Sequence, residues 1–111
     1  MARDTLLFRR DEARRVGWLE VRTQVRRDLR TALDALIPGE RVWIFGSLTQ
    51  PGRFTDASDV DVALEAEPAV ISAGRLSSEL SERLARPVDV VLLDTCRFRD
   101  KIRREGELWT L

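Results

Sequence analysis

Acidic residues in the centre of the chain have the types and spacing needed to hold a metal ion. Asp59 and Asp61 lie in an alternating run, Ser58 to Leu64, that is typical of a strand with one polar face. Asp89 lies in a later apolar run, Val88 to Leu93, that is typical of a buried strand. Because alternate residues of a strand share a face, the first two carboxylates are close enough to share a cation.

A third carboxylate joins this pair if the two strands are neighbours. A cluster of Asp59, Asp61 and Asp89 is costly unless a cation compensates it. The expected ion is Mg²⁺, which prefers oxygen ligands and completes its shell with waters and substrate phosphates. An alternative stays open, in which the first two aspartates belong to a solvated strand face and Asp89 bonds a backbone amide at its strand start.

A glycine-serine pair, Gly46-Ser47, follows the apolar run Val42 to Phe45 and predicts a buried strand that ends in a tight turn. Glycine lets a phosphate approach the backbone closely, and a serine hydroxyl with amides at the start of a short helix binds it. An ordinary strand-ending turn has the same sequence. The segment is not a Walker A loop, because Gly52 is not followed by Lys and then Ser or Thr.

Missing residue types exclude several kinds of chemistry for this chain. It has no histidine, which excludes Ser-His-Asp and Cys-His nucleophile systems and a His-ligated zinc site. Its single cysteine, Cys96, cannot form an internal disulfide and is expected to be a small apolar residue of a reduced, cytoplasmic protein. Carboxylates are therefore the main candidates for catalysis.

Length and charge predict one compact domain over residues 1–111. The chain has 111 residues, of which 43% are hydrophobic, and its 19 basic and 19 acidic residues cancel. No overall field attracts nucleic acid or an anionic membrane, so direct binding to either is not expected. No apolar run approaches the roughly 20 residues of a membrane span, and the first residues lack the apolar core of a signal peptide. We therefore expect a cytoplasmic protein.

Residues 4–37 have the pattern of an amphipathic helix that ends at Pro38 and Gly39. Apolar residues recur there every three or four positions: Val21, Val25, Leu29, Leu33 and Leu36 or Ile37. An earlier stripe through Leu7, Val16 and Leu19 belongs to the same helix or to a separate one, because Gly17 weakens the middle by up to about 1 kcal/mol.

The same segment carries arginines that lie mostly off the apolar stripe: Arg14, Arg15, Arg22, Arg26, Arg27 and Arg30. They fit a solvated helix face, and they also fit a surface that docks a partner or an anion.

Later patterns predict strands over about 41–46, 59–65 and 88–93 and two further helices. The first of these two further helices has an apolar stripe of Ala73, Leu76, Leu80 and Leu84. We expect Pro68 near its start and Ala85-Arg86-Pro87 at its end. The second helix covers about 95–105, with Asp94 or Thr95 as its N-cap and Gly106 at its C-terminal cap.

Taken together, these motifs resemble the polymerase-β-like nucleotidyltransferase superfamily, and in particular the minimal nucleotidyltransferases. The family pattern is Gly-Ser, a loop, Asp-x-Asp and a third acidic strand. This chain has Gly46-Ser47, an eleven-residue loop, Asp59-Val60-Asp61 and then Asp89, and its end from Ile102 to Trp109 is similar to the family's closing helix, turn and short strand. The resemblance covers about residues 41–109. It implies an α+β fold in which a small mixed β-sheet is flanked by helices, with a long N-terminal helix.

The resemblance also implies a reaction. Asp59 and Asp61 would hold two Mg²⁺ ions on ATP, Gly46 and Ser47 would bind its β and γ phosphates, and Asp89 would complete the metal site and help take the proton of the attacking oxygen. Residues 41–111 would form the catalytic core of the single domain, and residues 1–40 its N-terminal helical segment. Nucleotidyl transfer with release of pyrophosphate follows.

Relatives of this type act as antitoxins beside HEPN-domain ribonuclease toxins, and in some cases they transfer AMP to a tyrosine of the toxin. This chain has no tyrosine, so such a target lies on another molecule, and the partner would set the oligomeric state. The long N-terminal helix, with Leu6 to Phe8 and Trp18, is a candidate docking surface. Two alternatives stay open: a non-catalytic antitoxin that blocks its partner sterically, and a nucleotidyltransferase for a small-molecule acceptor.

Overall fold

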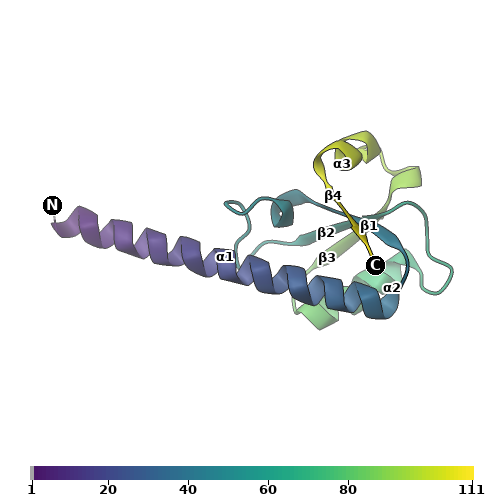
Figure 1. Ribbon diagram of the computed structural model, residues 1–111, viewed down its shortest axis with the longest axis horizontal. Coiled ribbons are helices and arrows are strands. Elements are labelled where there is room, and N and C mark those ends of the chain that lie inside the picture. The colour runs from purple at the N-terminus through teal and green to yellow at the C-terminus, as the bar shows by residue number, and fades with distance from the viewer. Residues whose placement is uncertain (1) are drawn as a thin grey trace.

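One long helix, two shorter helices and a mixed sheet make up the regular structure of the described part of the chain (Figure 1). The computed structural model describes the backbone of residues 2–111 and the side chains of residue 10 and residues 12–111. Helix α1 (Ala2–Leu36) runs through Gly17 without a break, so the two apolar stripes belong to a single helix. It ends before Pro38 and Gly39, as predicted, and Gly39 has a φ of 82° that favours glycine.

The sheet has four strands within the described residues, in the order β3-β2-β1-β4. Strand β1 (Arg41–Phe45) pairs antiparallel with both β2 (Val60–Leu64) and β4 (Glu107–Thr110), and β2 pairs parallel with β3 (Val88–Leu92). Helix α2 (Ala73–Leu84) lies on the connection between β2 and β3, as a parallel pair requires. The predicted α+β fold with a small mixed sheet and a long N-terminal helix is confirmed.

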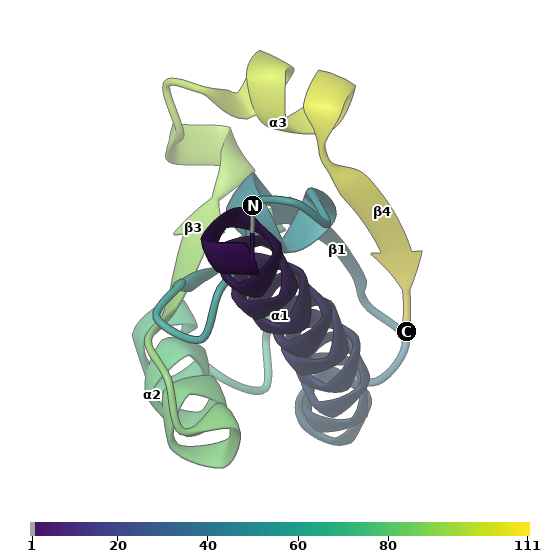
Figure 2. The same ribbon diagram turned by 90° about the vertical axis from the view of Figure 1, so that its left-hand side faces the viewer.

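The main core lies between one face of the sheet and the two long helices. Alternate residues of β1 and β2 point into it and are fully buried: Val42, Ile44, Val60, Val62 and Leu64. Helix α1 contributes Val25, Leu29 and Leu33, and α2 contributes Leu76 and Leu80. Figure 2 shows α1 and α2 side by side across the sheet. Residues of odd number in β2 therefore face the other side of the sheet, which these helices leave open.

Helix α2 begins later than Pro68 suggested. Its N-cap is Ser72, whose hydroxyl accepts a hydrogen bond from the amide of Arg75 at 3.2 Å. Pro68 lies upstream of this cap, because a side-chain cap and not the proline sets the first turn. The helix ends at Ala85, which adopts the left-handed conformation (φ 54°) just before the predicted stop at Arg86-Pro87.

Helix α3 (Arg99–Glu105) is shorter than predicted, and neither Asp94 nor Thr95 caps it. Both residues lie in a short 3₁₀ turn, Leu93–Thr95, whose buried Leu93 packs against Ala63 and Ile102. Because Leu93 is buried, strand β3 is followed by this separate 3₁₀ turn, and α3 begins only after Phe98.

Gly106 is the C-cap of α3, as predicted, but it does not adopt the left-handed conformation that glycine often has at this position. Its backbone is extended (φ −80°, ψ 171°), and a Cβ there would lie 2.6 Å from the carbonyl oxygen of Ile102 and 3.0 Å from that of Ile44. Glycine is therefore required because the chain at Gly106 passes between the last turn of α3 and β1 with no room for a Cβ.

The N-terminal half of α1 extends beyond the rest of the molecule (Figure 1). The principal extents are 60 × 28 × 20 Å, and the buried core residues of α1 begin only at Val25. Val16 in the projecting half is 44% exposed, and Trp18 is half-buried. The side chains of Leu6 to Phe8 lie outside the described residues. In the described residues, no helix is both long enough and apolar enough to span a membrane.

Candidate functional site

Gly46 lies directly against a carboxylate of the neighbouring strand. Strand β1 ends at Phe45, and Gly46 begins the 3₁₀ turn η1 (Gly46–Thr49) with a φ of 76°. A Cβ at this position would lie 2.5 Å from Oδ2 of Asp61. Only glycine combines this φ with this approach, so the predicted tight turn is present and its backbone is held beside the carboxylate. Ser47 follows within η1 and is half-buried.

Asp61 and Asp89 lie side by side on the open face of the sheet. They are register partners in the parallel pairing of β2 with β3, and Asp61 is also the register partner of Phe45 in β1. Asp59 lies just before β2, two residues from Asp61, so it is expected to extend the same face. Strand pairing thus brings Asp61 and Asp89 together, and Asp59 is near enough for its charge to act on Asp61.

The charges of the three carboxylates act on one another. Burial raises the pKa of Asp61 above its usual range, and the charges of Asp89 and Asp59 raise it further. Within the described part of the chain, no hydrogen bond or ion pair engages any of the three. Uncompensated carboxylate oxygens of this kind are the donors that a hard cation such as Mg²⁺ prefers, so the residues fit that ion chemically.

The carboxylates do not, however, form a finished metal site. Across the described residues, no group of three or more cysteine, aspartate or glutamate side chains could hold a metal ion as it stands. Like charges repel, and the exposed side chains of Asp59 and Asp89 are free to turn apart. Binding of a cation by all three would therefore require these two side chains to rotate inward, and the metal role of the aspartates stays a prediction.

Arg86 fixes the loop that leads into Asp59. Its guanidinium donates a hydrogen bond to the carbonyl oxygen of Ser58 at 2.9 Å and lies 5.0 Å from the ring centroid of the buried Phe54. The Ser58 hydroxyl in turn accepts a hydrogen bond from the amide of Thr55 at 2.9 Å. From the sequence, Arg86 is predicted only as part of a helix end, because nothing in its local pattern indicates a contact with a distant loop.

Two arginines of α1 contact the Gly46–Thr49 turn. Arg22 and Arg26 both donate to the carbonyl oxygen of Leu48. The arginines of this helix were predicted to form a solvated face or a surface that docks a partner or an anion. For Arg22 and Arg26 the solvated face is wrong, and the docking surface stays a prediction. Helical spacing shows that two residues share a face, but not what that face contacts.

A pocket of about 420 Å³ adjoins Gly46 on the open side of the sheet. Phe45 and Val91 line it from the sheet, and Phe98 and Lys101 line it from the segment around α3. Cys96 contributes a half-buried wall and packs against the small apolar cluster beneath α3, in agreement with its predicted apolar role. The pocket leaves room for part of a ligand beside Gly46, and none of the three aspartates is among its lining residues.

Comparisons with known proteins place this fold and site in a family. Residues 26–108 match the family model described as nucleotidyltransferase domain, and the chain belongs to that family. The match reaches further toward the N-terminus than the motifs did, because it includes the half of α1 that packs on the sheet. A comparison with curated proteins gave no match.

A solved structure has a similar fold. It is a crystal structure of a toxin-antitoxin with AMP-PNP, and one of its chains is 24% identical to this chain with a TM-score of 0.59. The alignment covers 77% of this chain and 73% of that chain.

Proposed function

We propose that this protein is a Mg²⁺-dependent nucleotidyltransferase that acts as an antitoxin. In this proposal it transfers AMP from ATP to a HEPN-type ribonuclease toxin and thereby neutralises the toxin. Membership of the nucleotidyltransferase domain family supports the class of reaction. The observation that carries the proposal is the contact of Gly46 with Asp61, which is itself the register partner of Asp89 on an open sheet face.

Each site residue has a role in the proposed reaction. Gly46 and Ser47 bind the β and γ phosphates of ATP through backbone amides and the serine hydroxyl. Asp59 and Asp61 would hold two Mg²⁺ ions, and Asp89 would complete the site. Bound Mg²⁺ would neutralise charge on the triphosphate and stabilise the attacking and leaving oxygens.

The acceptor oxygen attacks the α-phosphorus of ATP, the bond from that phosphorus to its bridging oxygen breaks, and pyrophosphate leaves. The proton of the acceptor hydroxyl passes to Asp89, whose side chain is exposed beside the half-buried Asp61. Gly46 and Asp61 lie in contact, so the groups assigned to the leaving phosphates and to the metal already face the same space.

The partner assignment rests on shape and on fold similarity. A structure of the same fold comes from a toxin-antitoxin with an ATP analogue bound. The projecting half of α1 offers surface outside the core, including the half-buried Trp18. We assign docking of the toxin to the projecting half of α1 and catalysis to residues 41–111 of one domain, with the partner setting the stoichiometry.

Intact-mass measurement of the partner tests this function. The chain is co-expressed with the product of the neighbouring gene, as wild type and as an Asp59→Ala, Asp61→Ala double variant. Wild type should add one or more AMP units to the partner and neutralise it, and the double variant should do neither. Full neutralisation by the double variant, with no mass change from wild type, would instead establish the steric antitoxin.

A second candidate is a nucleotidyltransferase for a small-molecule acceptor. The pocket of about 420 Å³ favours it, because it gives a small molecule a place, without any partner, beside Gly46, which itself lies against Asp61. Incubation with ATP labelled at the α-phosphate and a protein-free cell extract separates the two candidates. Label in a low-mass product other than AMP, formed without the partner, would favour the small acceptor.

A further inference from the structure

The Gly46–Thr49 turn is tied to α1 through one backbone oxygen. Nε of Arg22 donates to the carbonyl oxygen of Leu48 at 2.8 Å, and Nη1 of Arg26 donates to the same oxygen at 3.3 Å. The two arginines are four residues apart and so share one face of the helix. The side chain of Leu48 is fully buried in the main core, so both the backbone and the side chain of this residue are fixed.

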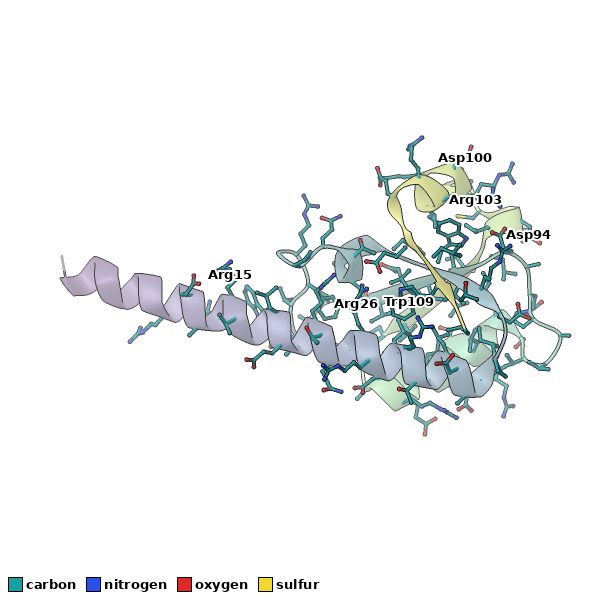
Figure 3. All side chains as sticks on the ribbon, in the orientation of Figure 1. Arg15, Arg26, Asp94, Asp100, Arg103 and Trp109 are labelled. Carbon is teal, nitrogen blue, oxygen red and sulfur yellow. The ribbon has the colours of Figure 1, made fainter. Side chains whose placement is uncertain are left out.

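Arg26 is itself held in place. Its guanidinium forms a two-pronged pair with Glu107 of β4, from Nη1 to Oε1 at 3.1 Å and from Nη2 to Oε2 at 2.6 Å. The guanidinium of Arg26 also lies 5.3 Å from the ring centroid of Trp109. Figure 3 shows the side chains of Arg26 and Trp109 together between α1 and β4. A planar guanidinium with several fixed partners is a rigid donor. The turn is therefore connected to α1 and, through Arg26, to the edge strand of the sheet.

These contacts provide hydrogen-bond donors for a carbonyl group at the end of the turn. The last carbonyl groups of a short helix have no partners within it. The amide of Gln50 satisfies the carbonyl oxygen of Ser47 at 3.0 Å, and the hydroxyl of Thr49 satisfies that of Gly46 at 2.8 Å. The carbonyl oxygen of Leu48 is satisfied from α1 instead. Cations at this end also complement the negative end of the turn's dipole.

The other end of the same turn, Gly46, lies against the carboxylate of Asp61. Gly46 lies so close to Asp61 that no Cβ fits between them, and a small rotation of the turn would change this approach. No basic residue occurs between Ser47 and Arg53 to hold the turn from within its own loop. Its orientation relative to Asp61 therefore depends on groups from elsewhere in the fold.

We propose that Arg22 and Arg26 are positioning residues, which fix from α1 the orientation of Gly46 and Ser47 relative to Asp61. The nucleotide part of this inference rests on the proposed function, in which the turn binds the phosphates of ATP. Neither arginine needs to touch the substrate. Loss of Arg22 is expected to loosen the turn and weaken the binding of Mg·ATP.

Arg22→Ala is compared with a matched control, Arg30→Ala. Arg30 lies on the same helix and also donates to a backbone carbonyl, that of Thr110 at 2.8 Å, but it does not contact the turn. The first measurement is hydrogen exchange at the amide of Gln50, whose bond to Ser47 closes the turn, in the nucleotide-free protein. Exchange should be about tenfold faster in Arg22→Ala and unchanged in Arg30→Ala.

Calorimetry with Mg·ATP is the second measurement. The Kd should rise about tenfold in Arg22→Ala and stay within about twofold in Arg30→Ala. Arg22→Lys should recover part of the affinity, because a lysine still donates to the carbonyl. If Arg22→Ala does not fold, Arg22→Met keeps the apolar stem, removes every donor and takes its place in both measurements.

Different results identify different failures. Equal loss of thermal stability in Arg22→Ala and Arg30→Ala, with unchanged Gln50 exchange and unchanged Kd in the former, would overturn the positioning role. Absence of Mg·ATP binding by wild type would overturn the proposed function instead. The exchange measurement does not use nucleotide, and it would then still support or overturn the claim that the arginines hold the turn.

Discussion

Gly46 is the residue on which the geometry of the candidate site depends most. Gly46→Ala should destabilise the protein by about 2 kcal/mol, because it combines a positive φ with a Cβ placed 2.5 Å from Asp61 Oδ2. Gly39→Ala is the matched control, since Gly39 has a φ of 82° and nothing within 4 Å of its Cβ position. Thermal unfolding of both variants separates backbone strain from the contact.

The contact has its own control. Asp61→Ala removes the carboxylate that an added Cβ would meet, so in combination with Gly46→Ala it should recover part of the lost stability. Equal stability losses for Gly46→Ala and Gly39→Ala would contradict the role of the contact.

The negative charge of Asp61 destabilises the folded protein when no cation is bound. Asp61→Asn should raise the free energy of unfolding at pH 7 by up to about 1 kcal/mol, because it removes a half-buried charge that burial, Asp89 and Asp59 all oppose, and solvent screens part of the effect. Mg²⁺ should raise the melting temperature of wild type and have little effect on the variant. Thermal unfolding with and without MgCl₂ measures both. A variant less stable than wild type, in a protein that Mg²⁺ does not affect, would count against a cation site.

Asp89 should matter for transfer more than for nucleotide binding. Asp89→Asn is expected to bind Mg·ATP within a few-fold of wild type and to transfer little AMP, since the proposed role of Asp89 is to serve the attacking oxygen. Calorimetry and the rate of AMP incorporation test the two parts separately. Loss of thermal stability together with an unchanged transfer rate would mean that Asp89 only supports the start of β3.

At the scale of elements, the pair of Arg26 and Glu107 connects α1 to β4. Arg26 lowers the pKa of Glu107 by hydrogen bonding, from an ordinary value of 4.5. A lowered folded-state pKa gives stability that is present above the unfolded pKa and is lost as the pH falls through the folded pKa. The stabilisation is therefore complete at neutral pH, begins to fall near pH 4.5 and is lost as the pH passes through the lower folded-state pKa.

Glu107→Gln should consequently lower the free energy of unfolding by about 1 kcal/mol at pH 7, a small effect because solvent reaches both side chains, 26% and 36% exposed. The difference from wild type should vanish as the pH falls below the folded-state pKa. Glu105→Gln, an exposed residue with no ion pair in the described part of the chain, serves as the control. Denaturant unfolding at several pH values provides the measurement. A difference that does not change with pH would exclude the ion pair as its cause.

On the scale of the whole molecule, α1 has two halves with different relations to the fold. Leu29→Ala should lower the free energy of unfolding by about 2–4 kcal/mol, because Leu29 is fully buried between α1 and the sheet. Val16→Ala in the projecting half, where Val16 is 44% exposed, should change it by less than about 0.5 kcal/mol. Chemical denaturation measures both. A large effect of Val16→Ala would show that the projecting half contributes to the folding of the domain.

The sequence alone determined most of the elements and the residue types of the site. Each strand or helix is indicated by a local pattern in its own segment. These patterns are the alternation around Asp59 and Asp61, the apolar runs before Gly46 and around Asp89, and the leucine stripe of α2. The mixed α+β fold was implied by the resemblance of these motifs to the nucleotidyltransferases. The short turn at Gly46-Ser47 was also predictable, because glycine marks it within the chain itself.

Tertiary structure alone decided how these elements meet. Parallel pairing of β2 with β3 places Asp61 opposite Asp89, and the burial of Leu93 moved the start of α3 to Arg99. The contacts of Arg22 and Arg26 with Leu48 join residues more than twenty positions apart. A local pattern shows only which residues share a face, whereas the packing of the whole chain selects what lies against that face.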